Sequence, residues 1–380
     1  MINPTQKPWR PLAAPALNWQ EDVPAAATAG DIYFSTENGL AESDYVFLEG
    51  NQLRDRWSKV DVEQPFVIAE VGFGTGLNAC LTLAEWLRDR PEGGSLHYIA
   101  IEHAPLSPTD AERALSRWPE LAPILSSLLA RWPDPLPGCH RRRFSEWGVT
   151  IDLWWGDAAA VLGDLASHAK PWVDAWYLDG FAPSREQGPW QQEVYDAMAA
   201  LSQPGATFAT FTAAGAVRRG LNAAGFTVHK RRGYGTKRDA LFGHVHHAVT
   251  LPNSLTPWDI NPQPVRARRA LVIGAGLAGA HAAHALAIRG VEVTVLEARC
   301  AASGGSGNLQ GVTYTRLSHQ HNPLTDFSVA ALGFAADSYQ SMSAAGQLTE
   351  GEDFGVGGYI QLHDDDETLE HLRQTLPLAP

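Results

Sequence analysis

FVIAEVGFGTGLN, residues 66–78, is an apolar run of strand length that meets three alternating glycines. Residues 77–87 then have the pattern of a helix. Glycines at such a turn let the backbone approach a bound nucleotide closely, and the following helix presents free N–H groups at its N-terminus. This strand–loop–helix unit predicts a doubly wound α/β sheet with a nucleoside ligand at the loop.

The spacing of the glycines favours S-adenosylmethionine (SAM) over a dinucleotide. The dinucleotide fingerprint is G-x-G-x-x-G, whereas this loop has G-x-G-x-G, with Leu77 at the position of the third fingerprint glycine. A carboxylate two residues before the first glycine can reach the cationic amino acid part of SAM. A tight turn without a ligand is the alternative. The candidate cofactor residues here are Glu70, Gly72, Gly74, Gly76 and Asn78.

Acidic residues at the ends of later strands extend this candidate site. Glu102 ends the predicted strand 96–101, where a carboxylate can accept the ribose hydroxyls, and Asp157 follows the strand 149–155, where it can bind the adenine amino group. The strand 172–178 leads into Asp179 and Phe181. Methylation of an amine needs a neutral nitrogen with its lone pair aimed at the methyl carbon, and we expect these two residues to orient it.

Length and composition limit the class of protein. With 380 residues the chain is expected to form two domains, and 44% hydrophobic and 19% charged residues are typical of a soluble globular protein. No apolar run reaches the roughly 18–20 residues of a membrane helix. The three cysteines are few and far apart, which argues against a disulfide framework or a zinc cluster and predicts a cytoplasmic protein. The net charge of −13 argues against a generic nucleic-acid coat.

A second nucleotide-binding pattern follows a proline-rich linker, residues 252–269. Residues 270–273 form a predicted strand, 274–279 the complete G-x-G-x-x-G, and 280–289 a helix. A second glycine-rich loop, SGGSGNLQG at 303–311, favours FAD over NAD, because amine oxidases run such a loop past the pyrophosphate and flavin. The candidate FAD-binding residues are Gly274, Gly276, Gly279, Glu297 and Gly305. We expect domains at 1–251 and 270–380, the second incomplete for an oxidase of this type.

Three further segments give less specific predictions. Residues 1–30 have no clear period and predict an irregular arm, and residues 31–57 predict either a lid over the cofactor or a pair of capping helices. A closing hairpin is expected from 226–228 and 248–251. Between its strands lies the basic stretch 230–239, which together with Arg218, Arg219 and Arg141–Arg143 predicts one basic patch for a phosphate backbone.

The order of these motifs resembles that of the MnmC family of bifunctional tRNA-modifying proteins. The resemblance rests on DIYFSTENGLAESDYVFLEGNQL, EVGFGTGLN, DGFAPSREQGPW, RRGYGTKRDAL and VIGAGLAGA followed by SGGSGNLQG. It implies an N-terminal SAM-dependent methyltransferase and a C-terminal FAD-dependent oxidoreductase of the D-amino-acid-oxidase kind. The FAD part would remove the carboxymethyl group of 5-carboxymethylaminomethyl-2-thiouridine at the tRNA wobble position, and the methyltransferase would then methylate the resulting amine.

The resemblance also implies roles for single residues. Glu70, the loop glycines and Glu102 would hold SAM, Asp179 would position the amine, and the Gly274–Gly279 loop with Glu297 would hold FAD. We therefore expect a tRNA N-methyltransferase, acting as a monomer away from membranes. Two alternatives remain: an FAD-dependent amine oxidoreductase that uses the first domain as a substrate platform, and a nucleotide-gated RNA-binding protein.

Overall fold

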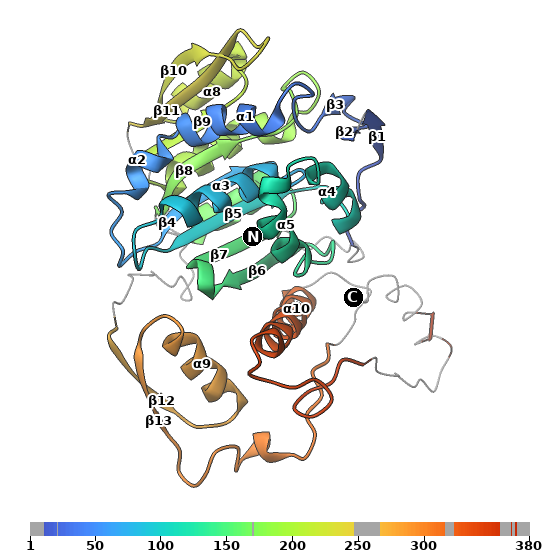
Figure 1. Cartoon of the computed structure of the whole chain (residues 1–380), viewed down its shortest axis with the longest axis vertical. Coiled ribbons are helices and arrows are strands. Elements are labelled where there is room, and N and C mark those ends of the chain that lie inside the picture. Colours follow the sequence, from blue (N-terminus) through green and yellow to red (C-terminus); the bar gives the residue numbers. More distant parts are fainter. Residues whose placement is uncertain are drawn as a thin grey trace. The chain divides into compact units, whose positions relative to one another are not determined.

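A computed structural model describes residues 11–20, 22–168, 171–246, 267–315, 323–357, 366 and 369–370. The chain divides into two compact units (Figure 1). Unit 1 comprises Met1–Asp259 with Arg316–Pro380, and unit 2 comprises Ile260–Thr315. The predicted linker, 252–269, lies outside the described residues as far as residue 266. Among the described residues, none of the helices combines the length and apolar character that crossing a membrane requires.

Unit 1 is built on an eight-stranded sheet with the strand order β10-β11-β9-β8-β4-β5-β7-β6. The five strands from β9 to β7 are parallel, while β6 and β11 run antiparallel to their neighbours. The strands are β4 (Phe66–Val71), β5 (Leu96–Glu102), β6 (Gly138–Phe144), β7 (Val149–Trp155), β8 (Val173–Leu178), β9 (Ser202–Thr210), β10 (Phe226–Arg232) and β11 (Asp239–Val245).

The strand order reverses between β4 and β8. From β4 the chain proceeds to β5 and β7 on one side, then returns to β8 and β9 on the other. In open α/β sheets, ligands bind at such a point, outside the carboxyl ends of the strands. All six residues of β4 are buried, as expected for a central parallel strand with covered faces. The predicted doubly wound α/β fold is thus confirmed for unit 1.

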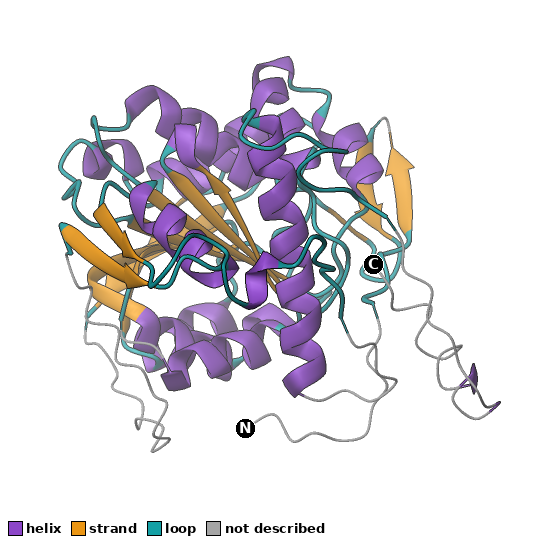
Figure 2. Cartoon of the chain, turned by 90° about the horizontal axis from the view of Figure 1, so that it is seen from below, coloured by secondary structure: helices purple, strands orange, loops and turns teal. Residues whose placement is uncertain are grey.

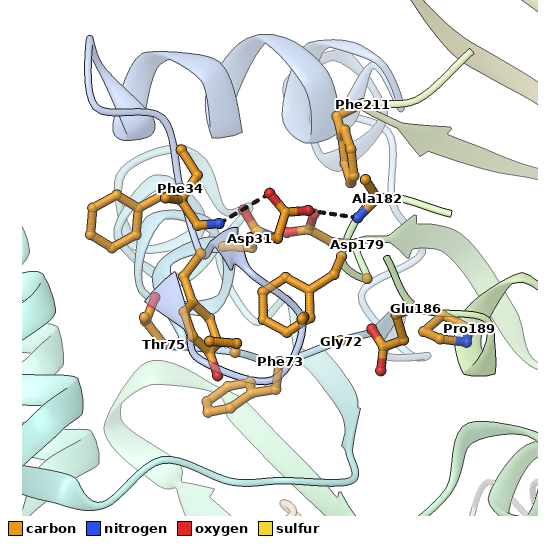
Figure 3. Close-up of a pocket in the computed structure, with 18 of the residues that line it drawn as sticks. Asp31, Phe34, Gly72, Phe73, Thr75, Asp179, Ala182, Glu186, Pro189 and Phe211 are labelled. Atoms are coloured by element: carbon orange, nitrogen blue, oxygen red, sulfur yellow. Dashed lines mark hydrogen bonds between the residues drawn. The ribbon is translucent and has the colours of Figure 1, made fainter. Parts of the chain in front are cut away.

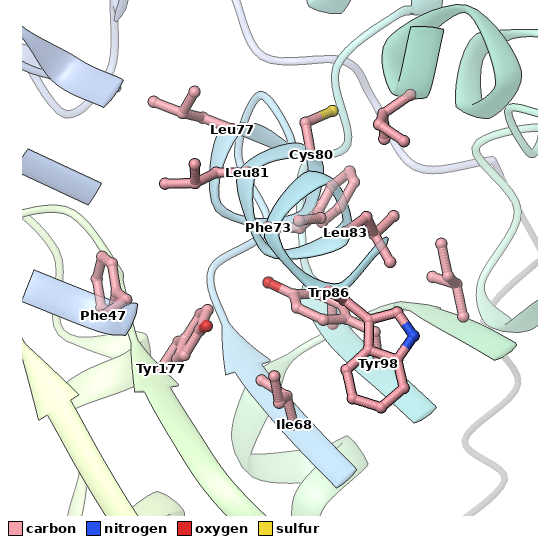
Figure 4. Close-up of a cluster of buried hydrophobic side chains, with 14 of the residues drawn as sticks. Phe47, Ile68, Phe73, Leu77, Cys80, Leu81, Leu83, Trp86, Tyr98 and Tyr177 are labelled. Carbon is pink, nitrogen blue, oxygen red and sulfur yellow. The ribbon is translucent and has the colours of Figure 1, made fainter. Parts of the chain in front are cut away.

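Helices cover both faces of this sheet (Figure 2). One hydrophobic core joins α2, α3 and α5 to one face of β4 and β5, and the other joins α6, α7 and α8 to the opposite face. The core around α3 contains Trp86 of the helix itself and aromatic side chains from other elements, such as Phe47 and Tyr98 (Figure 4). The α-helices of unit 1 are α1 (Gly39–Ser43), α2 (Leu53–Trp57), α3 (Leu77–Asp89), α4 (Pro108–Leu115), α5 (Ala122–Leu129), α6 (Ala158–His168), α7 (Gln192–Leu201), α8 (Gly215–Ala223) and α10 (Pro323–Ala344).

Short elements complete the unit. They are the π-helix η1 (Asp44–Glu49) and the 3₁₀ turns η2 (Pro119–Leu121), η3 (Ser145–Trp147) and η4 (Gly188–Trp190). The expectation of an irregular arm before residue 30 is wrong for part of that segment. A small antiparallel sheet forms from β1 (Leu17–Gln20), β2 (Val23–Ala26) and β3 (Asp31–Ile32). Val23 and Ala26 are buried, so apolar contacts order a segment without a sequence period.

A closing hairpin forms from β10 and β11, whereas the predicted second strand, 248–251, lies outside the described residues. β10 and β11 pair from Phe226 with Val245 to Arg232 with Asp239, so only residues 233–238 form the turn. Because β11 is antiparallel to both β9 and β10, β10 runs in the same direction as β9. The turn therefore lies at the carboxyl edge of the parallel strands, which is the edge that bears the glycine loop.

The single basic patch predicted from Arg141–Arg143 and the hairpin is wrong. These arginines lie on β6, whereas the hairpin ends in β10, and the two strands form opposite edges of the sheet. Arg141 also pairs with Asp152 through two hydrogen bonds of 2.7 and 2.6 Å, and Arg142 is buried. These two guanidinium groups already have protein partners, so they are poorly placed to meet a phosphate backbone.

Helix α10 packs against β6 within unit 1. Arg131 donates two hydrogen bonds to Asp337 of α10, at 2.8 and 2.5 Å, and the Arg142 Nε lies 3.3 Å from the same carboxylate. Leu136 and Val329 form a small buried apolar contact. Helix α10 belongs to the segment that the sequence analysis assigned to the second domain; the domain limits themselves stay a prediction.

Unit 2 has the elements of one strand–helix–strand motif. β12 (Arg269–Ile273) and β13 (Glu292–Leu296) pair in parallel, with α9 (Leu277–Ala287) between them in sequence, followed by the 3₁₀ turn η5 (Gly305–Gly307). The strand and helix limits agree closely with the prediction. Ile273 is 83% exposed and Leu271 58%, although parallel strands are normally covered on both faces.

The segment 39–57 is fixed to the sheet by a buried amide. Asn51 is fully buried between η1 and α2, and its Nδ2 donates to the carbonyl oxygens of Phe47 and Trp176 at 3.0 and 3.3 Å. Its Oδ1 accepts a hydrogen bond of 2.6 Å from Thr207. One side chain thus joins this segment to both β8 and β9.

We expect Asn51→Ala to destabilise the fold. The substitution removes the donor to the Trp176 carbonyl and the acceptor of the Thr207 hydroxyl, which then keeps the 2.7 Å hydrogen bond from Arg56. A buried polar group that loses its partner costs about 1–3 kcal/mol. Urea unfolding of the purified chain measures the change. Asn222→Ala is the matched control: among the described residues its amide donates to the Arg218 carbonyl alone, and its side chain is on the exposed face of α8. Equal stability of the two variants would contradict the anchoring role.

Candidate active site

A cavity of about 670 Å³ lies at the carboxyl ends of the central strands, a volume in the usual range for small-molecule sites. Figure 3 shows Asp179 and the glycine loop at Gly72 and Phe73 among its lining residues. Seven of the residues predicted for the SAM and amine sites line this cavity: Gly72, Gly74, Asn78, Glu102, Asp157, Asp179 and Phe181. Glu70 and Gly76 do not line it.

The glycine loop is shaped by a close approach between two strand ends. Gly72 has a φ of 95°, and a Cβ atom built on it would lie 1.8 Å from the carbonyl oxygen of Asp179. The Asp179 N–H donates to the Val71 carbonyl at 2.8 Å, which holds the two chain segments together. Gly74 and Gly76 also have positive φ values. The first glycine therefore serves the contact with Asp179 as well as the turn itself.

Glu102 is fixed in the cavity wall by two backbone donors. Its Oε2 accepts from the N–H of Gly74 at 3.0 Å, and its Oε1 accepts from the N–H of Ala104 at 2.9 Å. The side chain is nearly buried but still lines the cavity. Each carboxylate oxygen has two lone pairs, so Glu102 can accept ribose hydroxyls without giving up either bond.

Asp157 begins helix α6 and faces the same cavity. Its Oδ1 accepts from the N–H of Ala160 at 2.9 Å, which is the bond of an N-capping side chain. The residue is exposed, and its second oxygen has no hydrogen bond among those found in the described part of the chain. That oxygen suits an exocyclic amino group, while the capping bond fixes the side chain.

A buried polar network links Glu70 to Asp179. The Asn78 Nδ2 donates to Glu70 Oε1 at 2.8 Å and to Asp179 Oδ2 at 2.7 Å. The Tyr98 hydroxyl donates to Glu70 Oε2 at 2.9 Å, and the Ser43 hydroxyl donates to the side-chain amide oxygen of Asn78, Oδ1. Glu70 thus lies beneath the cavity and acts on its surface through Asn78. Direct contact of Glu70 with SAM stays a prediction.

Both carboxylates are poorly solvated. Burial raises the pKa of Glu70 well above its usual value, and the neighbouring Asp179 raises it further. Burial also raises the pKa of Asp179 to about 7, against the opposing effects of the Asn78 hydrogen bond and the Lys237 charge. An aspartate with this pKa can exchange a proton with an amine near neutral pH.

Phe181 is held at the cavity mouth from two sides. The edge of its ring meets Tyr33 with the centroids 5.0 Å apart, and its carbonyl accepts a hydrogen bond of 2.7 Å from the Trp190 indole. The adjacent N–H of Ala182 donates to Asp31 at 2.9 Å. Residues 31–43 therefore lie along the cavity, whereas α2 packs into the core with Leu53 and Trp57 buried. The choice between a lid and capping helices for 31–57 stays open.

Among the charged side chains that line the cavity, acidic ones outnumber basic ones. A negative lining favours cationic ligands, and both the sulfonium of SAM and a substrate ammonium carry positive charge. The acidic lining residues are Asp31, Glu37, Glu42, Glu102, Asp157, Asp179 and Glu186, and the basic ones are Arg185 and Lys237. Sequence reasoning did not name Glu42, Phe211 or Lys237 as site residues. It assigned 31–57 to a lid or capping helices and 230–239 to a phosphate-binding stretch, and only the fold brings the three residues together.

Unit 2 contains the other predicted nucleotide loop. Gly274 has a φ of 99°, and a Cβ atom on Gly279 would lie 1.9 Å from the Gly274 carbonyl oxygen. The Glu297 carboxylate accepts from the N–H groups of Ala275 and Arg299, and these hydrogen bonds lower its pKa. This ionised group at the end of β13 fits the ribose of FAD.

The second glycine-rich loop of unit 2 lies beside the first. The Ser306 hydroxyl accepts from the N–H of Leu277 at 3.0 Å, and a Cβ atom on Gly276 would lie 2.9 Å from that hydroxyl oxygen. Gly305 begins the 3₁₀ turn η5, and no atom lies within 4 Å of the place its Cβ would take. These residues fit a pyrophosphate close to the backbone.

Gly72→Ala is expected to reduce the free energy of unfolding by more than about 2 kcal/mol, because an alanine would be strained at this φ and would also collide with the Asp179 carbonyl. Urea unfolding monitored by tryptophan fluorescence measures the loss. Gly163→Ala is the control: it lies in α6 with no atom within 4 Å of its Cβ position, and alanine there is expected to stabilise the helix. A Gly72→Ala variant as stable as the wild type would show that the strand ends do not approach so closely.

Two family models match the chain in sequence order. Residues 119–246 match the model described as S-adenosyl-L-methionine-dependent methyltransferase, and residues 269–379 match that of FAD dependent oxidoreductase. The first part of the chain is therefore a SAM-dependent methyltransferase domain, and the second is an FAD-dependent oxidoreductase module.

Relatives from two bacteria are similar along nearly the whole chain. The tRNA 5-methylaminomethyl-2-thiouridine biosynthesis bifunctional protein MnmC of Aeromonas hydrophila is 42% identical over 362 residues, covering 94% of this chain and 53% of the relative. The corresponding protein of Chromobacterium violaceum is 43% identical over 360 residues, covering 93% of this chain and 52% of the relative. The chain spans about half the length of these relatives.

Among solved structures, MNMC2 from Aquifex aeolicus is similar at 19% identity and a TM-score of 0.48, covering 65% of this chain and 75% of that one. The relatives at 42–43% identity are named as bifunctional proteins, and the two family models match a methyltransferase and an oxidoreductase in this chain. The chain belongs to the MnmC family.

Proposed function

We propose that this protein methylates the primary amine of 5-aminomethyl-2-thiouridine at the tRNA wobble position, with SAM as the methyl donor. The observation that carries the proposal is the carboxylate of Asp179, held by Asn78 in an acidic cavity beside the glycine loop. The names of the relatives at 42–43% identity refer to the biosynthesis of the methylated product, which supports the choice of substrate.

Different residues of the cavity would bind the cofactor and the substrate amine. The loop at Gly74, with Glu102 and Asp157, would hold the nucleoside of SAM, which supplies an electrophilic methyl group when bound. The substrate amine enters as an ammonium ion, and Asp179 takes one of its protons to free the lone pair. After transfer the secondary amine again carries a positive charge, and the acidic lining stabilises that charge throughout.

The tRNA would approach the hairpin edge of the sheet. The turn after β10 brings Arg232 and Arg238, both exposed, to the same edge as the cavity. Exposed arginines suit phosphate contacts, and Tyr234 in the same turn can stack on a base. Arg218 and Arg219 of α8 are exposed as well. As a tRNA-modifying enzyme the protein is expected to act in the cytoplasm, as a monomer.

For unit 2 we propose FAD binding, with Gly274, Gly276, Gly279 and Gly305 against the pyrophosphate and Glu297 on the ribose. In the full-length family this module would remove the carboxymethyl group and so supply the amine. The exposed strands β12 and β13 support the interpretation that the described part of this unit is one portion of a larger FAD domain. Its predicted limits, 270–380, are part of the proposal.

Asp179→Ala is expected to lower the methylation rate by about 10²-fold or more, the usual loss when a positioned acid–base group is removed. The assay measures transfer of labelled methyl from SAM to tRNA that carries 5-aminomethyl-2-thiouridine, with nucleoside analysis of the product. SAM binding should survive in the variant. Asp55→Asn, an exposed change on α2, is the control.

Normal methylation by Asp179→Ala would refute the role of Asp179. If the wild type bound tRNA but transferred no methyl group, the result would favour the RNA-binding alternative.

Binding of SAM is expected to release protons near pH 7. Asp179 has a pKa of about 7 in the free protein and is therefore about half protonated there. The sulfonium charge favours the carboxylate form and lowers this pKa, so up to about half a proton leaves at pH 7 and progressively less as the pH rises above 8.

Calorimetric titration in phosphate and in Tris measures the released protons through the different ionisation enthalpies of the two buffers. S-adenosylhomocysteine, which lacks the sulfonium charge, is the matched ligand and should release fewer protons. Asp179→Asn should abolish the difference between the two ligands. A SAM binding enthalpy that does not depend on the buffer would contradict the predicted titration.

A further inference from the structure

A lysine side chain reaches into the cavity from the hairpin turn. The Lys237 Nζ lies 2.7 Å from Glu42 Oε1 and 4.4 Å from the centroid of the Phe211 ring. The three residues come from the turn 233–238, from α1 and from the segment after β9. An ammonium ion between a carboxylate and an aromatic face is held by charge and by the electron-rich face of the ring.

Glu42 is suited to bind a cation because it is buried and incompletely hydrogen-bonded. Its side chain is only 11% exposed, and its Oε1 atom is buried without a hydrogen bond of good geometry among the described residues. The Lys237 ammonium is close enough for an ion pair but is not well aligned as a donor. A buried carboxylate oxygen that is incompletely satisfied is costly, so a better-aligned donor would gain free energy there.

Lys237 itself is only partly enclosed. Its side chain is 45% exposed, and it reaches Glu42 from a turn whose only internal backbone bonds are Gly233 N–H to Arg238 and Lys237 N–H to Tyr234. The base of the hairpin is fixed more firmly, since the Tyr45 hydroxyl donates to the Arg232 carbonyl at 2.8 Å. The long lysine chain can therefore leave while the hairpin stays in place.

We propose that Glu42 and the ring of Phe211 form the subsite that receives the protonated primary amine of the substrate, and that Lys237 occupies this subsite until the substrate displaces it. The inference rests on the proposed function, because it identifies the entry position of the same aminomethyl group. The charges of Lys237 and Glu42 both act on the pKa of Asp179, so the subsite lies within electrostatic reach of the proposed base.

This arrangement separates recognition of the amine from its deprotonation. Glu42 and Phe211 select a cation of the size of an alkylammonium, and Asp179 then accepts the proton. A wobble uridine without the aminomethyl group cannot displace the lysine by charge, so it gains nothing from the subsite. Lys237 thus acts as an internal competitor that lowers the affinity for the aminomethyl group, while Glu42 and Phe211 provide the preference for that group over the unmodified base.

The test compares the affinities of two tRNA probes, measured with S-adenosylhomocysteine present so that no reaction occurs. One probe carries 5-aminomethyl-2-thiouridine at the wobble position, and the other carries 2-thiouridine there. The wild type should prefer the aminomethyl probe by about tenfold, as expected for a charge-assisted hydrogen bond. Glu42→Gln should abolish this preference, and Phe211→Leu should reduce it. Lys237→Ala should increase it, because the competitor is gone.

The controls are Glu112→Gln and Lys59→Ala, both exposed and outside the cavity, which should keep the wild-type preference. Thermal melting of each variant checks the fold. If Lys237→Ala weakens both probes equally, the lysine is a phosphate contact and the inference is wrong; the same holds if Glu42→Gln keeps the preference. A failure of the proposed function would be distinct, because the wild type would then transfer no methyl group to the aminomethyl probe.

Discussion

The close backbone approach of Gly72 and Asp179 is the constraint on which the candidate site depends. A side chain at position 72 would overlap the Asp179 carbonyl, so the end of β4 and the end of β8 can meet only through a glycine. This contact brings the cofactor loop and the proposed base within one cavity, although 107 positions separate the two residues in sequence. The sheet topology makes this contact possible, because β4 and β8 are neighbouring strands at the point where the strand order reverses.

Desolvation then gives the site its chemistry. The Asn78 amide donates to both Glu70 and Asp179. This shared donor fixes the positions of the two acidic side chains relative to each other. Glu70 receives a second hydrogen bond from Tyr98, so both of its oxygens have protein partners, while burial raises its pKa and disfavours its charged form. Asp179 has fewer partners and faces the cavity, and its carboxylate is therefore the one that can respond to a ligand. The same fold that buries these groups makes their protonation sensitive to positive charge nearby.

The amino-acid sequence predicted the elements that have local signals. Glycine spacing located both nucleotide loops, and the residues at strand ends, Glu102, Asp157 and Asp179, line one cavity as expected. What it could not predict depends on long-range placement. Arg141 to Arg143 looked like part of a basic patch, but the antiparallel pairing of β6 puts them at the far edge, beside Asp152 and Asp337. Glu42 and Lys237 are ordinary charged residues until the hairpin and α1 meet.

The packing of α10 on β6 has a consequence for how the two units are connected. Unit 1 contains residues both before and after unit 2, so unit 2 is an insertion whose two ends return to one body. The Asp337 contacts with Arg131 and Arg142 give the returning end a buried attachment. A single break in either connecting segment would leave unit 2 tethered through the other. Cleavage of one connection alone is therefore not expected to release unit 2 from unit 1.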